Sequence, residues 1–214
     1  MKSRRTLPVL LLVAAAALTA SGYERELSRG AARDAYFIGN RRDSSTEKFL
    51  AQYLKRLPLP KSGPHVAEVE VRTPFHQLVR RAQQDINYSA QRAQQDAQNA
   101  KLRLIVRVLI QLTPTYPAHS PTTLPPVDPI YLRDNYFFSE FRVKAYQSEE
   151  IKPLDARGTP TYLPGQTVGF SSLTGAELIY EYDTQKVGSG PLRIDVTGPG
   201  GTRTSVTFDL NALR

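Results

Sequence analysis

Residues 101–112 constrain the fold of this chain more than any other stretch, because their apolar side chains alternate over a full strand length. The apolar residues at alternate positions are Leu102, Leu104, Val106, Val108, Ile110 and Leu112. Ile105 and Leu109 make the opposite face partly apolar as well. A period of two is typical of a β-strand, and two apolar faces indicate a strand in the interior of a sheet. We therefore predict a central strand here, with Leu104 and Val106 buried or nearly so.

A strand and a long helix are expected just before this segment. Valines alternate with charged residues over residues 66–72, which fits a strand and places Glu68 and Glu70 on one face of it. Thr73 and Pro74 then form an N-cap followed by a first-turn proline, and the pattern predicts one long helix from residue 74 to about residue 101. This helix packs on the sheet in our prediction.

The long helix carries a narrow, alanine-rich stripe. The stripe consists of Leu78, Ala82, Ile86, Ala90, Ala93 and Ala97. We expect it to pack against the protein's own sheet; the alternative is a seam through helix 74–100 that joins two copies of the chain.

The segment 23–60 is predicted to be helical. Apolar residues recur at helical spacing from Leu27 to Ile38, before a stop at Gly39. Ser44 and Glu47 form a capping box for a second helix. Prolines after residue 57 end this second helix.

Short strands between turn residues dominate the C-terminal half. They are expected near residues 137–145, 151–163, 168–170, 177–182, 192–196 and 205–208, with hairpin turns at Arg157–Gly158 and at Pro199–Gly201. A proline-rich loop covers residues 114–129. Regular short strands point to an antiparallel sandwich. The fold class predicted for the chain is α+β, and residues 61–214 form one mixed domain with a β-sandwich-like C-terminal half.

The first 22 residues resemble an export signal. Lys2, Arg4 and Arg5 form a basic head, an apolar run follows from Leu7, and Ala20-Ser21-Gly22 offers a cleavage site. We expect cleavage by the signal peptidase after Gly22, and hence a periplasmic or secreted protein without a membrane span. A retained N-terminal anchor is the alternative, and the sequence leaves both the general and the twin-arginine export routes open.

Composition excludes several classes of function. The signal holds three basic residues and no acidic one, so its removal lowers the net charge from +8 to +5. This charge is scattered rather than clustered, which argues against a nucleic-acid partner and leaves an envelope protein or glycan as the expected one. The chain has no cysteine, which excludes thiol catalysis and thiolate metal sites.

The three histidines do not form a recognisable metal motif, and we expect them to face solvent. His65, His76 and His119 are neither spaced for one helix face nor part of an HExxH sequence. His65, His76 and Glu68 are the weak candidates for a metal site across the strand–turn–helix unit. The prediction is that the protein uses no metal, no cofactor and no catalytic histidine.

Tyrosine is the enriched residue type with binding chemistry, with eleven tyrosines and no tryptophan. A tyrosine ring offers a rigid face and a polar tip to a sugar or peptide. The weak binding candidates are Tyr116, Tyr131, Tyr136 and Tyr162. Together these features predict a non-catalytic structural or partner-binding module of the cell envelope, and the alternative is a hydrolase acting on envelope polysaccharide or peptide.

Overall fold

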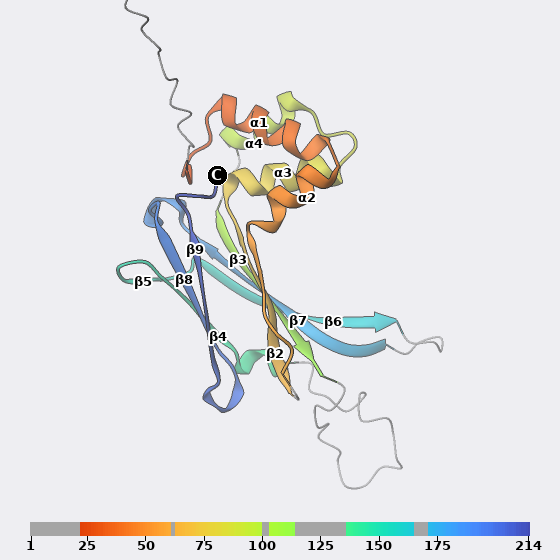
Figure 1. Ribbon diagram of the computed structural model, residues 1–214, viewed down its shortest axis with the longest axis vertical. Coiled ribbons are helices and arrows are strands. Elements are labelled where there is room, and N and C mark those ends of the chain that lie inside the picture. Colours follow the sequence, from red (N-terminus) through yellow and green to blue (C-terminus); the bar gives the residue numbers. More distant parts are fainter. Residues whose placement is uncertain (1–21, 61–62, 100–102, 114–135, 165–170) are drawn as a thin grey trace, which may run out of the picture.

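The computed structural model describes residues 22–60, 63–99, 103–113, 136–164 and 171–214. Over these residues the chain forms four α-helices and two antiparallel sheets, which confirms the α+β class. The helices gather at one end of the molecule, and the strands extend away from them (Figure 1). None of the described helices has the length and apolar composition that crossing a bilayer requires.

The first sheet, sheet A, has β3 at its centre. Its strands in spatial order are β1 (Leu54–Arg56), β2 (Pro64–Arg72), β3 (Leu104–Leu112), β7 (Ser171–Tyr182) and β6 (Asp155–Pro164). Leu104 and Val106 are fully buried, as the alternation predicts. The prediction of a central strand is therefore confirmed.

The second sheet, sheet B, is built mainly from the end of the chain. Its strands in spatial order are β5 (Glu150–Ile151), β4 (Arg142–Tyr146), β8 (Pro191–Thr197) and β9 (Arg203–Asp209). β8 and β9 form the predicted terminal hairpin, in which Ile194 lies opposite Val206. Gly200 and Gly201 adopt positive φ angles in its turn, a conformation that favours glycine.

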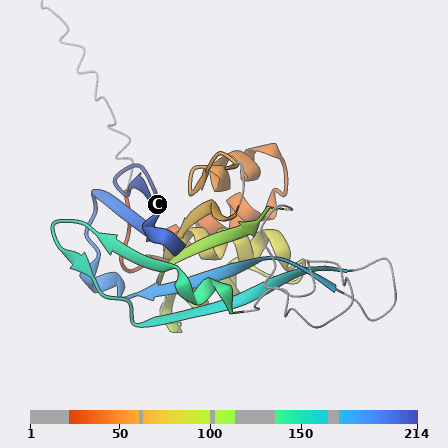
Figure 2. The same ribbon diagram turned by 90° about the horizontal axis from the view of Figure 1, so that it is seen from below.

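The two sheets share one apolar core. Val69, Val106 and Ile110 from sheet A belong to the same buried cluster as Ile194 and Phe208 from sheet B. Figure 2 shows the molecule from below, so that the strands of the two sheets lie toward the viewer and the helices lie behind them. This arrangement extends the sandwich beyond the C-terminal half, because β2 and β3 belong to it.

The helical layer consists of α1 (Arg29–Asn40), α2 (Ser44–Ala51), α3 (Pro74–Gln84) and α4 (Ala90–Asn99). Thr73 caps α3 by accepting the N–H of His76, as predicted, whereas α2 is capped by Asp43 rather than by Ser44. The carboxylate of Asp43 accepts the N–H groups of Ser45 and Thr46, which explains the difference. β1 lies inside the segment that we expected to be wholly helical.

The helices α1 and α3 approach each other closely at Gly39. A Cβ atom at this position would clash with the main-chain oxygen of Val79. Gly39 is therefore a packing residue inside α1 and not merely the stop of that helix.

The prediction of one helix over residues 74–101 is wrong. Asp85 adopts an extended backbone conformation that ends α3, and Ser89 accepts the N–H of Arg92 at the start of α4. The break leaves Ile86 77% exposed, whereas Ala82 and Ala93 are buried beside Tyr36 of α1. The alanine-rich stripe thus packs on α1 and not on the sheet.

The hairpin expected at Arg157–Gly158 is also wrong. β6 runs straight through these residues and pairs with β7, with Gly158 opposite Leu178. Gly158 makes room for the ring of Phe138, which a Cβ atom would contact too closely. The strand expected from residue 137 begins instead at Arg142, after a short 3-10 helix, η2 (Phe137–Glu140). The signal, the proline-rich loop and the strand at 168–170 lie outside the described residues.

Candidate functional site

The start of β2 and the β8–β9 turn lie at the end of the molecule away from the helices (Figure 1), and residues from both line a cleft of about 490 Å³ between the two sheets. We call it the inter-sheet cleft. Its apolar lining includes Leu57, Pro58, Val66, Phe141, Val196 and Pro199. Its polar lining consists of His65, Thr202, Arg203 and Thr204. This volume and a mostly apolar wall with a few polar groups are typical of ligand sites.

Two strand ends border the inter-sheet cleft without a second strand beside them. At Pro64–Val66, β2 pairs only with β3 among the described strands, and β9 pairs only with β8. Pro58 and Pro60, which follow β1, have no N–H to offer these edges. The edge of β2 beyond Ala67, whose carbonyl accepts the Leu57 N–H at 2.8 Å, and the outer edge of β9 therefore have no described strand beside them, and an extended ligand can pair with such an edge.

His65 supplies the polar floor of the cleft. Both ring nitrogens are buried and lack a hydrogen-bond partner among the described residues. Burial lowers the pKa of His65, and the nearby carbonyl groups of Gly63 and Gln111 oppose this shift without reaching hydrogen-bond geometry. His65 is therefore neutral at pH 7, and its two ring nitrogens lie beneath the surface of the cleft.

Arg203, one of the residues that line the cleft, pairs with Asp195 on β8. Asp195 is 3% exposed and accepts hydrogen bonds from Arg203 and from the hydroxyl of Ser205. Burial opposes the ionisation of Asp195, but these two hydrogen bonds together with the charges of Arg193 and Arg203 outweigh it and lower the pKa of the carboxyl. The ion pair holds the guanidinium on the outer face of sheet B, because Ile194 and Val196, the neighbours of Asp195 in β8, face the core.

The structure does not bring the metal candidates His65, His76 and Glu68 together. His65 lies at the start of β2, whereas His76 lies on α3 beyond the other end of that strand. Glu68 instead forms ion pairs with Arg56 at 3.2 Å and Arg107 at 3.4 Å. Within the described part of the chain no group of three histidine, cysteine or acidic residues is arranged to hold a metal ion. His119 lies outside the described residues.

His76 is fully buried, so the expectation that all three histidines face solvent is wrong. Its ring lies against that of Tyr53, with the centroids 4.6 Å apart, and its Nε2 atom is 3.5 Å from Glu70 Oε1. Burial, then the charges of Arg80 and Arg72, hold the pKa of His76 well below its ordinary value of 6.5. The proximity to Glu70 is therefore not an ion pair at neutral pH, because the imidazole carries no charge.

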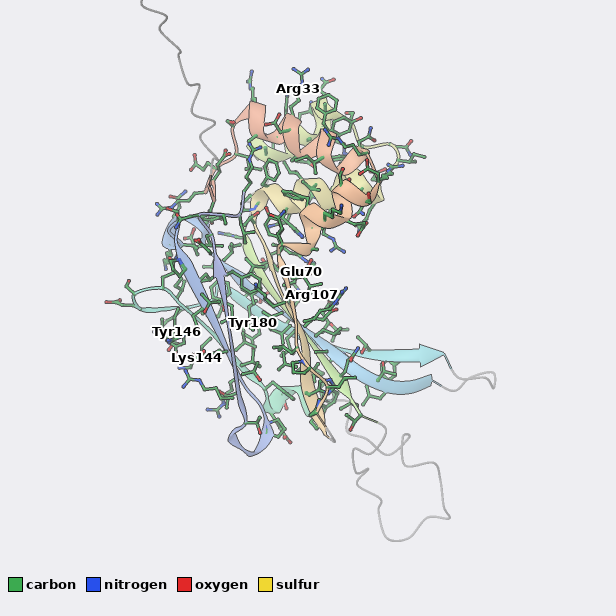
Figure 3. All side chains as sticks on the ribbon, viewed as in Figure 1. Arg33, Glu70, Arg107, Lys144, Tyr146 and Tyr180 are labelled. Atoms are coloured by element: carbon green, nitrogen blue, oxygen red, sulfur yellow. The ribbon has the colours of Figure 1, made fainter. Side chains whose placement is uncertain are left out.

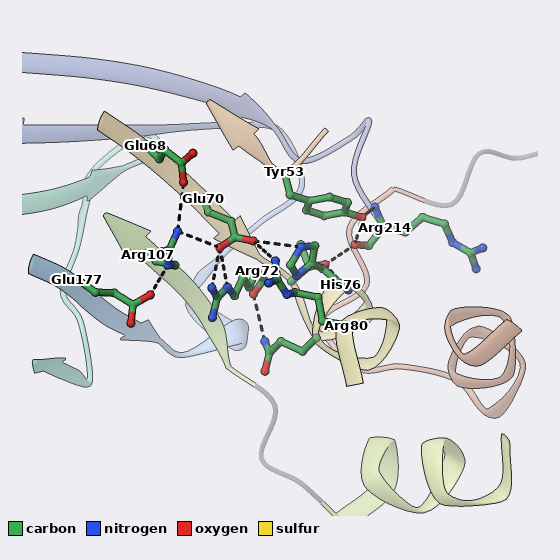
Figure 4. A network of polar contacts seen from close by, with 11 residues as sticks. Tyr53, Glu68, Glu70, Arg72, His76, Arg80, Arg107, Glu177 and Arg214 are labelled. Carbon is green, nitrogen blue, oxygen red and sulfur yellow. Dashed lines mark hydrogen bonds and ion pairs between the residues drawn. The ribbon is translucent and has the colours of Figure 1, made fainter. Parts of the chain in front are cut away.

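Three arginines surround the buried carboxylate of Glu70, and we call these four residues the Glu70 cluster (Figure 4). Arg72 lies 2.7 Å and Arg80 3.0 Å from different oxygens of Glu70, and Arg107 lies 3.8 Å away. Glu70 is only 4% exposed. Arginine residues from β2, α3 and β3 thus meet at a single carboxylate, which ties the helical layer to sheet A.

Arg107 extends the Glu70 cluster across the outer face of sheet A. It donates to Glu177 on β7 and contacts Glu68 on β2 (Figure 4). Burial favours the neutral form of Arg107, but the hydrogen bond and charge of Glu177 and the charges of Glu70 and Glu68 outweigh it and raise the pKa. Glu68 and Glu70 share one face of β2, as predicted, and their role is to bind arginine.

The tyrosine candidates do not line the inter-sheet cleft. Tyr136 is 71% exposed and Tyr162 is 41% exposed, and neither is among the residues lining the cleft. Tyr116 and Tyr131 lie outside the described residues.

Sequence reasoning missed Arg72 and Arg80. The sequence nevertheless holds a signal for both residues. Arg72 lies two residues after Glu70 on a strand and Arg80 lies four residues after His76 on a helix, so each pair shares one face of its element. The turn at Thr73–Pro74 then brings the strand face that carries Glu70 against the helix face that carries Arg80.

Comparison of the chain with protein-family models, with curated protein sequences and with solved structures gives no match.

Proposed function

We propose that this chain is an exported, non-catalytic binding module of the cell envelope, whose inter-sheet cleft holds an extended peptide segment of a partner protein. The observation that carries the proposal is the pair of open strand edges beside an apolar cleft of about 490 Å³. Main-chain pairing with an open edge gives affinity, and the pockets beside the edge select side chains.

The lining of the cleft offers a peptide both apolar contacts and polar groups. Phe141, Val196 and Val66 offer apolar contacts to side chains. Thr202 and Thr204 supply hydroxyl groups that can hydrogen-bond to the peptide.

Export is compatible with the fold at the expected cleavage position. Tyr23, the first residue after that position, is buried in the common core, and its N–H donates to the carbonyl of Leu210 at 3.0 Å. Cleavage before Tyr23 removes none of the core residues in the part of the chain that the structure describes, and the new amino group keeps the same acceptor.

The test is selection of a phage-displayed library of linear peptides on the protein that begins at Tyr23. Enriched peptides are then synthesised, and their affinities are measured for the wild type and for Thr204→Trp, which fills the cleft. Thr207→Trp is the matched control, because Thr207 is exposed on the same strand, on the face turned away from the cleft.

The proposal expects saturable binding to the wild type and to Thr207→Trp, and loss of binding in Thr204→Trp. Equal thermal midpoints of the two variants establish that both are folded. Failure of the library to enrich, or peptides that bind Thr204→Trp as well as the wild type, would overturn the proposal.

A further inference from the structure

A second cavity, of about 300 Å³, lies between α3 and the outer face of sheet A, beside the Glu70 cluster. Its lining consists of Arg72, Gln77, Arg80, Arg81, Gln84 and Ile105. Three of these six side chains are cationic and none is acidic. We call it the arginine cavity, and it is distinct from the inter-sheet cleft, whose lining shares no residue with it.

The buried carboxylate of Glu70 positions two of the cations. Arg72 donates from Nε at 2.8 Å and Arg80 from Nη1 at 3.0 Å, to different oxygens of Glu70 (Figure 4). A guanidinium carries five N–H groups, so each arginine keeps several donors after this contact. Because the arginines are fixed before a ligand arrives, little conformational entropy is lost on binding.

The charge around the arginine cavity favours an anion. Arg107 is engaged mainly by Glu177 and Glu68, so at the cavity itself the single carboxylate of Glu70 faces the two cations Arg72 and Arg80. The field of Arg80 and Arg72 contributes, after burial, to holding His76 neutral nearby. Arg81 is paired with Asp96 at 2.7 Å, but its side chain remains 49% exposed at the rim.

Gln77 adds an acceptor to these donors. Its Nε2 atom donates to the main-chain oxygens of Arg72 at 3.1 Å and Arg103 at 2.6 Å. Both amide hydrogens are thereby used, and the side-chain oxygen is left to accept a hydrogen bond. Guanidinium groups beside an amide oxygen suit a ligand that carries an anionic group together with hydroxyl groups.

The cavity is open enough to receive a group that belongs to a longer chain. The side chains of Arg72 and Arg80 are 24% and 35% exposed. We propose that the arginine cavity binds the oxyanion of an acidic glycan, either a sugar carboxylate or a phosphate ester. Arg72, Arg80 and Arg81 bind the anion, and the Gln77 side-chain oxygen accepts a hydrogen bond from a neighbouring hydroxyl.

Calorimetric titration of the protein that begins at Tyr23 tests this site with three probes. Oligogalacturonate presents carboxylates, a glycerol-phosphate oligomer presents phosphates, and dextran of matched size presents hydroxyls alone. We expect saturable binding of one or both acidic probes, and none of dextran. The acidic probe that binds more tightly identifies the anionic group.

Arg81→Gln is the main variant, because Arg81 is half-exposed and does not support the buried Glu70. Loss of one charge-assisted hydrogen bond lowers affinity about tenfold. Arg33→Gln removes the same charge from the far side of the helical layer (Figure 3), and it should change affinity by less than about twofold. Thr204→Trp should leave this binding unchanged, so the arginine cavity and the inter-sheet cleft are tested independently.

Three results would each overturn the inference. These are the absence of saturable binding by both acidic probes, binding of dextran as tight as theirs, and an equal loss of affinity in Arg81→Gln and Arg33→Gln. The last result would mean that the protein attracts polyanions through its overall charge alone.

Discussion

Tyr53 and Arg214 are joined by two hydrogen bonds: the Tyr53 hydroxyl donates to the Arg214 main-chain oxygen at 2.9 Å and accepts the Arg214 N–H at 3.1 Å. Thr73, the N-cap of α3, donates to the same oxygen. The Arg214 guanidinium lies 4.4 Å from the centre of the Phe75 ring. The residue next to β1, the start of α3 and the segment after β9 therefore meet at one point.

Replacing Tyr53 with Phe should destabilise the protein by about 1–2 kcal/mol, because a buried pair of hydrogen bonds is lost without a change in packing. Burial raises the pKa of Tyr53 to about 12, so its hydroxyl is protonated at any physiological pH. Urea unfolding measures the effect. Tyr162→Phe, at an exposed position, is the control and should be neutral; equal stability of the two variants would contradict the role of Tyr53.

Replacing His76 with Phe should flatten the pH dependence of stability between pH 7 and about 5.5. The unfolded histidine takes up a proton near pH 6.5, whereas burial and then Arg80 and Arg72 prevent this in the fold. The wild type therefore loses stability as the pH falls below 6.5, by up to about 1.4 kcal/mol per pH unit. Glu70, 3.5 Å away, and the ring of Tyr53 are the other groups that face this imidazole.

Urea unfolding at several pH values measures this slope in the wild type, His76→Phe and His76→Gln. Neither replacement titrates, so both slopes should be flatter whatever the cost in packing. A wild-type slope in both variants would show that His76 is not the group responsible.

Gly39→Ala should cost about 1–3 kcal/mol, because the added methyl group must separate α1 from the Val79 carbonyl of α3. Gly30→Ala in the same helix is the matched control. Its methyl group meets only Ser28 Oγ, at 3.8 Å, so it should raise stability by up to about 1 kcal/mol through helix propensity. Thermal unfolding distinguishes the two, and a stabilising Gly39→Ala would rule out the close contact.

Leu104→Asp should destabilise the protein by at least about 3 kcal/mol, because it places an unpaired charge at a fully buried position of β3. Gln111→Asp, at an exposed position of the same strand, should change stability by less than about 1 kcal/mol. Chemical unfolding of both variants tests the prediction. Comparable losses would mean that the two positions are equally accessible.

Export with cleavage after Gly22 predicts that protein recovered from the envelope fraction or the medium begins at or near Tyr23. N-terminal sequencing gives the answer directly. Replacing Leu10 and Leu12 with Glu, which interrupts the apolar run, should retain the full-length chain in the cytoplasm. An intact Met1 on exported protein would contradict cleavage.

The elements that sequence reasoning identified correctly are those in which local pattern and long-range packing agree. The alternation around Val106 encodes both a strand and its burial on the core side. The helix break was missed because Ile86 continues the apolar stripe of α3. The extended conformation of Asp85 and the hydrogen bond from the Arg92 N–H to Ser89 override that periodicity, and Ile86 faces solvent.

The candidate sites were less predictable than the fold, because they depend on which elements become neighbours. His65 was singled out, but its position beside Phe141 and Arg203 depends on how the two sheets pack. Glu70 was expected to share a face with Glu68, yet sequence spacing alone does not place Arg107 between them.

The chain order of the elements has a consequence for how the protein folds. The four helices and β2 are complete by residue 99, whereas β3 completes its ladder only when β7 is present and Leu104 pairs with Tyr182. Such non-local pairing is slow, and an apolar strand edge stays open while it is pending. We expect refolding from denaturant to show early helix formation followed by a slow sheet-forming phase, with aggregation increasing at higher protein concentration during that phase.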